Sequence, residues 1–69
     1  MHKKYYKLKG HRVLCGFTQG DMAAAIGKSV SSYRRKENGQ TDFRLREVIA
    51  ILEKLNSTPY TTTLEYLFS

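Results

Sequence analysis

The stretch that determines the fold is TQGDMAAAIGKSVSSYRRKENG, residues 18–39. Thr18, followed three residues later by Asp21, resembles a helix-starting capping box with Asp in place of Glu. Gly27 can adopt a positive φ and end that helix, and Ser29 is a natural N-cap for the next one. These signals predict two short helices joined by a tight turn, over residues 18–26 and 29–37.

Helical signals continue on both sides of this stretch. Upstream, Leu8, Arg12 and Cys15 recur at spacings of four and three, which predicts a helix over residues 5–15. Downstream lies the best amphipathic pattern in the chain, with apolar residues at i, i+3, i+4, i+7 and i+10. Its members are Leu45, Val48, Ile49, Leu52 and Leu55.

A fifth helix is predicted after Pro59. The run TTLE, residues 62–65, resembles another capping box and begins a helix that ends near Phe68. Signals for β-structure are weak, because the Asn-Gly pair at residues 38–39 follows a helix-compatible basic segment and does not separate alternating apolar runs. The sequence therefore predicts one all-α domain of five short helices, residues 1–69.

Charge is unevenly distributed along the chain. Twelve Lys and Arg against six Asp and Glu give a net charge of +6. Residues 1–12 carry five of the cations and residues 28–36 carry four, with no acid in either segment. This asymmetry indicates a polyanionic partner on one side of the molecule, nucleic acid before a membrane surface.

Length and composition argue against several classes of protein. The apolar fraction of 41% is enough for one compact core but leaves no room for a buried active-site cavity. A single cysteine indicates a reduced, intracellular protein and, with only two histidines, argues against a zinc site. No apolar run approaches the length of a membrane span or forms a signal peptide. We therefore expect no enzyme, catalytic residue, cofactor, metal or small-molecule substrate.

The segment over residues 29–38 divides into two faces when it is placed on a helix with about 100° per residue. Ser31, Arg35 and Asn38 form a polar ridge flanked by Arg34, opposite the edge that anchors the helix. Such a helix suits insertion into a DNA major groove, where Arg pairs with guanine and Ser or Asn with other base edges or phosphates. The alternative is a solvated basic helix with no DNA contact.

A set of residues lies at fixed offsets across the predicted helix, turn and helix, and continues into the fourth helix. Its members are Thr18, Gln19, Met22, Ala23, Ile26, Gly27, Ser29, Tyr33, Glu37, Asn38, Gly39, Leu45, Val48, Ile49, Ile51 and Leu55. This pattern resembles the helix-turn-helix domains of the Cro and phage-repressor type, the Xre family. The resemblance covers about residues 8–68 and is greatest to short regulators from phages and prophages of Gram-positive bacteria. It implies a compact, lambda-repressor-like fold whose second and third helices form the helix-turn-helix.

The resemblance also implies roles for individual residues. The helix from Ser29 to about Glu37 would be the recognition helix. Gln19 would contact a phosphate and brace that helix, and Arg12 would form a structural ion pair with Glu37. Together with the helix faces and charges described above, the resemblance predicts that DNA is bound by Gln19, Lys28, Ser29, Val30, Ser31, Arg34, Arg35 and Asn38.

Within that set the implied contacts differ. Val30, Ser31 and Arg35 would face bases, and Asn38 would lie near the DNA backbone after the helix. Val30 also lies at the edge of the apolar face, so packing in the core competes with contact to a thymine methyl group.

Other positions have two interpretations. Lys28 and Lys36 occupy positions that are often apolar in relatives, and their stems would cover the core while the ammonium groups reach solvent or phosphate. Tyr5 and Tyr6 either cap the core or belong to a flexible, basic N-terminal arm, residues 1–6, that reaches DNA.

The sequence as a whole predicts a sequence-specific regulator that binds double-stranded DNA in the bacterial cytoplasm, on the nucleoid when bound. Leu64, Leu67 and Phe68 of the last helix either close the core or form the patch of a homodimer that reads a palindromic operator. The alternative function is a small, antirepressor-like interaction module that keeps the fold without tight DNA binding.

Overall fold

The computed structural model describes residues 4–69, which form five α-helices and no β-strand. The helices are α1 (Tyr6–Leu14), α2 (Gln19–Ile26), α3 (Val30–Glu37), α4 (Leu45–Asn56) and α5 (Leu64–Phe68). The predicted all-α, five-helix architecture is confirmed.

The helix-turn-helix begins and ends at the capping residues predicted from the sequence. Thr18 Oγ1 accepts a hydrogen bond from the Asp21 N–H at 3.1 Å, and Asp21 Oδ2 accepts one from the Thr18 N–H at 2.8 Å. Gly27 ends α2 with a φ of 69°, and Ser29 Oγ accepts the Ser32 N–H at 3.1 Å at the start of α3. The turn between α2 and α3 therefore follows from local sequence.

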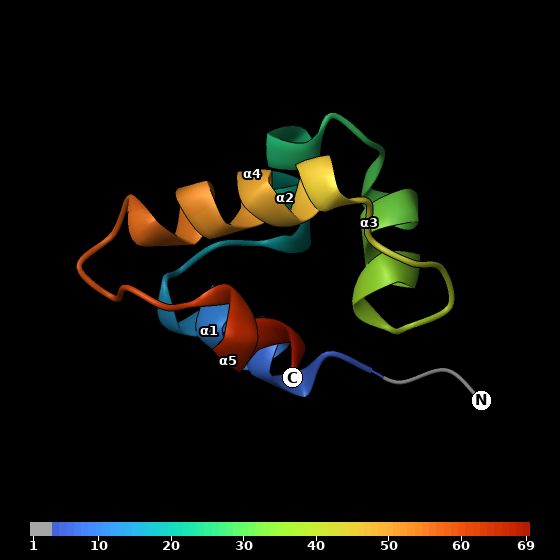
Figure 1. Ribbon diagram of the computed structural model, residues 1–69. Helices are drawn as coiled ribbons and strands as arrows, with labels where there is room; N and C mark the ends of the chain where they lie inside the picture. Colours follow the sequence, from blue (N-terminus) through green and yellow to red (C-terminus); the bar gives the residue numbers. More distant parts are fainter. Residues whose placement is uncertain (1–3) are drawn as a thin grey trace.

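The five helices form two groups around one core. α2 packs against α3 and α4, while α5 lies beside α1, so that the first and last helices are neighbours (Figure 1). α3 lies at one side of the domain, supported by α2 and α1. This arrangement leaves the outer face of α3 uncovered by any other helix of the described chain.

Every helix contributes apolar residues to the core. The buried members are Leu8, Met22, Ala23, Tyr33, Ile51, Leu55 and Leu67. α5 enters through Leu67, which is 1% exposed, and Phe68 packs against the same cluster. Of the three α5 residues considered for a dimer patch, these two therefore close the core, and Leu64 remains exposed.

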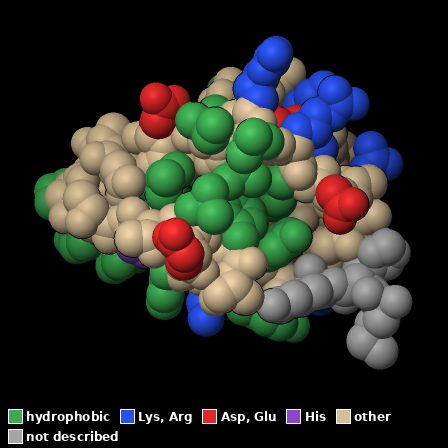
Figure 2. Space-filling view, viewed as in Figure 1, with side chains coloured by type: hydrophobic (Ala, Val, Ile, Leu, Met, Phe, Trp, Pro, Cys, Tyr) green, Lys and Arg blue, Asp and Glu red, His purple; other side chains and the backbone are tan. Residues whose placement is uncertain are grey.

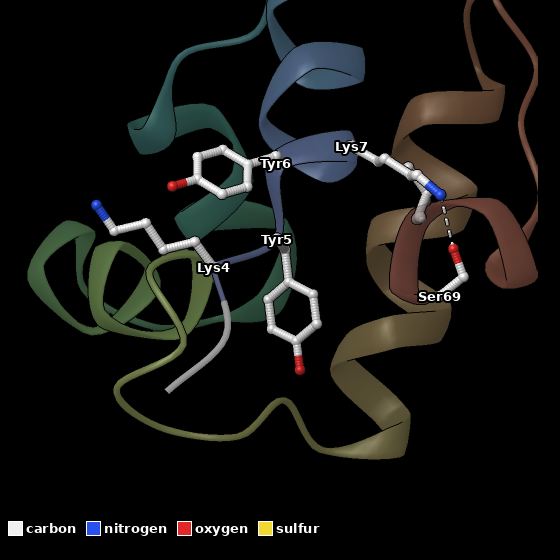
Figure 3. Close-up of a pocket in the computed structure, with 6 residues that line it drawn as sticks. Lys4, Tyr5, Tyr6, Lys7 and Ser69 are labelled. Atoms are coloured by element: carbon white, nitrogen blue, oxygen red, sulfur yellow. Dashed lines mark hydrogen bonds between the residues drawn. The ribbon is translucent and has the colours of Figure 1, made fainter. Parts of the chain in front are cut away.

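An aromatic cluster covers the edge of the core. Its ring centroids lie 5.6 Å apart for Tyr5 and Phe43, 5.3 Å for Tyr5 and Phe68, and 5.5 Å for Phe43 and Phe68. Tyr5 thus caps the core, whereas Tyr6 is exposed and its ring points to a different side (Figure 3). Residues 1–3 of the predicted N-terminal arm lie outside the described residues.

α4 buries a narrower stripe than its amphipathic pattern predicts. Ile51 and Leu55 are fully buried, but Leu45 and Ile49 are 72% and 47% exposed. The closest helical neighbour of α4 is α2, and one neighbouring helix covers only part of a wide apolar stripe. One side of α4 therefore presents apolar side chains to solvent.

α5 begins one residue later than the predicted capping box. Thr63 Oγ1 accepts the Tyr66 N–H at 3.2 Å, whereas a box over residues 62–65 needs Thr62 as the cap. The Thr62 backbone is held instead by Asn56, which accepts its N–H at 2.7 Å and donates to its carbonyl at 3.2 Å. The predicted box is wrong because Thr62 is tied to the end of α4.

Candidate nucleic-acid interface

A buried hydrogen-bond network holds the inner side of α3, which faces α1 and α2. The Glu37 carboxylate, 2% exposed, accepts Arg12 Nε at 2.9 Å and Arg12 Nη2 at 3.3 Å, which is the ion pair implied by the resemblance. It also accepts the Tyr33 hydroxyl at 2.7 Å and Gln19 Nε2 at 3.3 Å. A buried charge is tolerated only when it is paired and hydrogen-bonded, so this network sets the position of α3 relative to α1 and α2.

Tyr33 takes part in this network as a neutral donor. Burial, followed by the hydrogen bond to Glu37 and the charge of that carboxylate, raises the pKa of Tyr33 far above its usual value. The phenol is therefore neutral at ordinary pH and donates its proton to the Glu37 carboxylate.

Gln19 connects the buried network to the surface of α3. Its Nε2 donates to Glu37, and its Oε1 accepts Nε of Arg34 at 3.3 Å. The two bonds fix which way the amide points, since only its oxygen can accept from a guanidinium. The bond to Arg34 uses Nε alone, so both Nη groups remain for a base or a phosphate.

The outer face of α3 carries most of the residues that the sequence assigned to DNA. Ser31, Arg34 and Arg35 are exposed. Val30 is 41% exposed and lies outside the core cluster, so the structure gives it no core role. Figure 2 shows Lys and Arg side chains gathered on the side of the molecule where α3 and the start of α4 lie.

The other predicted residues flank this face. Lys28 is exposed in the turn before α3, and Ser29 is exposed while its hydroxyl caps the helix. Asn38 is the half-buried C-cap of α3, and its N–H donates to the Arg34 carbonyl at 3.0 Å. Lys28 and Ser29 therefore lie at the start of α3 and Asn38 at its end, while Gln19 of α2 lies beside it.

Lys36 is the clearest departure from the sequence prediction. It is 8% exposed, and its Nζ donates to Glu47 Oε1 and to the Asp42 carbonyl, both at 3.0 Å. The prediction that this ammonium reaches solvent or phosphate is wrong, because Glu47 of α4 supplies a buried counter-charge. Lys36 joins the end of α3 to the start of α4 and is not a candidate DNA contact.

The environment of Glu47 keeps it ionised. Burial alone raises the pKa of its carboxyl, but hydrogen bonds from the Arg44 N–H and Lys36, with the charges of Lys36 and Lys28, outweigh burial and hold the pKa below its usual range. Oε2 of this carboxylate is buried and has no hydrogen-bond partner among the described residues.

Two cations near Lys28 were missed by the sequence reasoning. Arg44 and Arg46 line, with Lys28 and Glu47, a cavity of about 440 Å³ between the turn before α3 and the start of α4. The sequence could have indicated them, because two arginines at the start of a helix are unfavourable for its macrodipole and suggest a role other than helix stability. These residues extend the basic surface beyond α3.

Features of two other kinds of site are missing from the described chain. Within residues 4–69, no group of three or more His, Cys, Asp or Glu side chains is placed to hold a metal ion. No helix in that range has the length and apolar character needed to cross a membrane.

One comparison with known proteins is informative. A family model described as helix-turn-helix, HTH_3, matches residues 8–61, which is more than half of the chain. The matched range includes α2, α3, the buried Arg12–Glu37 pair and the cations at the start of α4. No curated protein and no solved structure gives a significant match.

Proposed function

The chain belongs to the Xre/Cro-type helix-turn-helix family of DNA-binding regulators, and on this premise we propose that it recognises a specific operator with α3. In this proposal α3 enters the major groove of double-stranded DNA, and the bound protein regulates transcription by covering a promoter. It acts in the bacterial cytoplasm as a Cro- or repressor-like protein of a phage or prophage.

The observation that carries the proposal is the contrast between the two sides of α3. Its inner side is held by Tyr33 and Glu37 in a buried network, while Arg34 and Arg35 lie on its exposed side. A helix whose inner side is held rigidly and whose outer side is cationic can present guanidinium groups to guanine O6 and N7 at defined positions.

The remaining residues fit supporting roles in the same complex. Ser31 and Val30, both exposed on α3, would contact base edges or a thymine methyl group, and the hydrogen bond from Arg34 to Gln19 would orient that guanidinium. Lys28 and Asn38, at the two ends of α3, suit contacts to phosphates, which fix register without reading sequence.

We further propose that two copies bind a palindromic operator, with half-sites about one helical turn, about 34 Å, apart. The sequence reasoning considered α5 as the dimer patch. Since Leu67 and Phe68 are occupied in the core, α5 retains only Leu64 and Tyr66 as exposed apolar residues.

Selection of bound duplexes from a random pool, using the full chain, tests this function. A palindromic consensus is expected, and affinity should fall steeply with salt because several phosphate contacts release counterions. The matched control is the Arg34→Ala/Arg35→Ala double variant, which should stay folded but yield no consensus. A chain that binds no genomic duplex at low salt would support the interaction-module alternative instead.

A further inference from the structure

α4 carries an exposed, partly apolar surface next to the basic surface, and the two share only Arg46. We call the partly apolar surface the α4 face, and it consists of Leu45, Arg46, Ile49, Ala50 and Glu53, which line an open cavity of about 420 Å³. Leu45 is 72% exposed and Ile49 is 47% exposed. Figure 2 shows hydrophobic side chains gathered where α4 and α5 lie, with acidic residues at the edges. Such contiguous apolar surface is a common mark of a protein interface.

The charges on this face have a symmetric arrangement. Arg46 and Glu53 are seven residues apart, so two helical turns place them on the same side of α4. The midpoint between them falls between Ile49 and Ala50. A second α4 that runs antiparallel about that midpoint places its own Glu53 opposite Arg46, and its own Arg46 opposite Glu53.

We propose that the α4 face is the docking site for a second copy of this chain, with the two α4 helices antiparallel about a two-fold axis near Ile49 and Ala50. An isologous contact of this kind needs a self-complementary surface, which Arg46 and Glu53 provide. The small side chain of Ala50 permits close approach at the axis, and antiparallel α4 helices oppose their dipoles.

The same observations favour a second copy over an unrelated partner. The chain carries a net charge of +6, so contact between copies through most of its surface is repulsive. On the α4 face one cation and one anion cancel, and the apolar residues between them, Leu45 and Ile49, gain from burial. One 12-residue helix against its copy forms a small interface, so the dimer should dissociate on dilution.

Sedimentation velocity without DNA, over a dilution series from micromolar to millimolar, tests the pairing. The parent chain should show a reversible monomer–dimer equilibrium. Arg46→Glu and Glu53→Arg should each weaken dimerisation about tenfold, because two exposed ion pairs become two like-charge contacts. Both side chains are on the surface, and circular dichroism checks that the variants remain helical.

An equimolar mixture of the two variants is the decisive sample. In the mixed dimer, the Arg46→Glu chain carries carboxylates at both positions 46 and 53, and the Glu53→Arg chain carries guanidinium groups at both. Antiparallel pairing places these opposite charges against each other, so the mixture should dimerise about as well as the parent. Lys9→Glu and Glu65→Arg, on α1 and α5, make the same changes in net charge and should leave dimerisation unchanged.

Three results would overturn the inference: a parent chain that stays monomeric up to millimolar concentration, charge reversals that behave like their controls, or a mixture that fails to pair. A dimer weakened by Glu65→Arg and untouched by the α4 variants would place the contact on α5. The inference rests on the proposed function in one respect, that two copies of the chain bind together. Its assay contains no DNA, so its failure leaves operator recognition by α3 open to the selection experiment, and failed selection leaves the pairing result intact.

Discussion

The buried pair of Lys36 and Glu47 allows a quantitative prediction. Lys36→Met leaves the Glu47 carboxylate with the Arg44 N–H as its partner, and Glu47→Gln leaves the Lys36 ammonium with the Asp42 carbonyl. Removal of one member of a buried pair costs about 3–5 kcal/mol when the remaining charge is uncompensated. Because each charge keeps one hydrogen bond, we expect each single variant to lose about 2 kcal/mol of unfolding free energy.

The double variant Lys36→Met/Glu47→Gln separates charge from packing. It removes both buried charges, and the amide oxygen introduced at position 47 still accepts the Arg44 N–H. We expect its stability to lie within about 1 kcal/mol of the parent, since buried pairs are often replaceable by neutral groups. The double-mutant cycle should therefore give an interaction energy of about 3 kcal/mol.

The pH dependence of the same variants has a definite sign. In the parent, the pKa of Glu47 is lowered on folding, so its contribution is complete above the unfolded pKa of about 4.3 and is lost as the pH falls through the folded pKa. In Lys36→Met the carboxylate is buried without the ammonium, which raises its pKa. Protonation then relieves the buried charge, so the deficit relative to the parent should be largest near pH 7 and shrink toward pH 4.

Urea unfolding followed by far-ultraviolet circular dichroism, for the parent and three variants at both pH values, measures these quantities. A change of midpoint at constant slope reports stability. Additive losses in the cycle, or a Lys36→Met deficit that is the same at pH 7 and pH 4, would refute the reasoning that Lys36 compensates a buried carboxylate.

Three further predictions concern DNA recognition and local stability. Arg35→Ala should cost about 1–3 kcal/mol of binding free energy on the selected operator and relax base preference. Lys28→Ala should weaken binding to all duplexes alike and reduce the slope of log affinity against log salt by about 1. Equal losses of affinity for Arg35→Ala on operator and random duplexes, in an anisotropy titration, would remove Arg35 from the base-reading residues. Gln19→Ala and Arg34→Ala should weaken operator binding by similar amounts and show little extra loss when combined, because Gln19 acts by orienting Arg34; additive losses in the same titration would contradict that relay. Gly20→Ala should raise the free energy of unfolding by about 0.5–1 kcal/mol, because alanine favours the helix and its Cβ would meet Thr18 Oγ1 at 3.5 Å and Val30 Cγ2 at 3.8 Å, which are ordinary contacts. A lower midpoint of urea unfolding would contradict this prediction.

The helix-turn-helix was predictable from sequence because its signals are local. Thr18 and Asp21 are three residues apart and cap α2 through each other, and Gly27 takes its φ of 69° at no steric cost because it has no Cβ. The exposed residues of α3 were predictable for a similar reason, since helical geometry places Ser31 and Arg35 on one side once Tyr33 is the anchor.

The α4 pattern shows where periodicity becomes insufficient. The spacing of apolar residues correctly predicts a helix over α4, but it does not say which part of a wide apolar stripe meets a neighbour. Leu45 and Ile49 are exposed because α2 packs against another side of α4. That outcome depends on the angle at which two helices cross, which no single helix encodes.

The sequence by itself determined the five helices, the caps of α2 and α3 and the division of α3 into an anchored and an outward face, because each depends on residues within about two turns of one another. Only the tertiary structure decided the partners of the long polar side chains. Gln19 meets Arg34 across fifteen residues because α2 packs against α3, and Lys36 meets Glu47 across eleven because the fold brings the start of α4 to the end of α3. From sequence alone, a lysine at a position that is usually apolar is expected to reach solvent with its ammonium group. Lys36 does not, because its counter-charge, Glu47, lies on another helix and only the fold brings the two together.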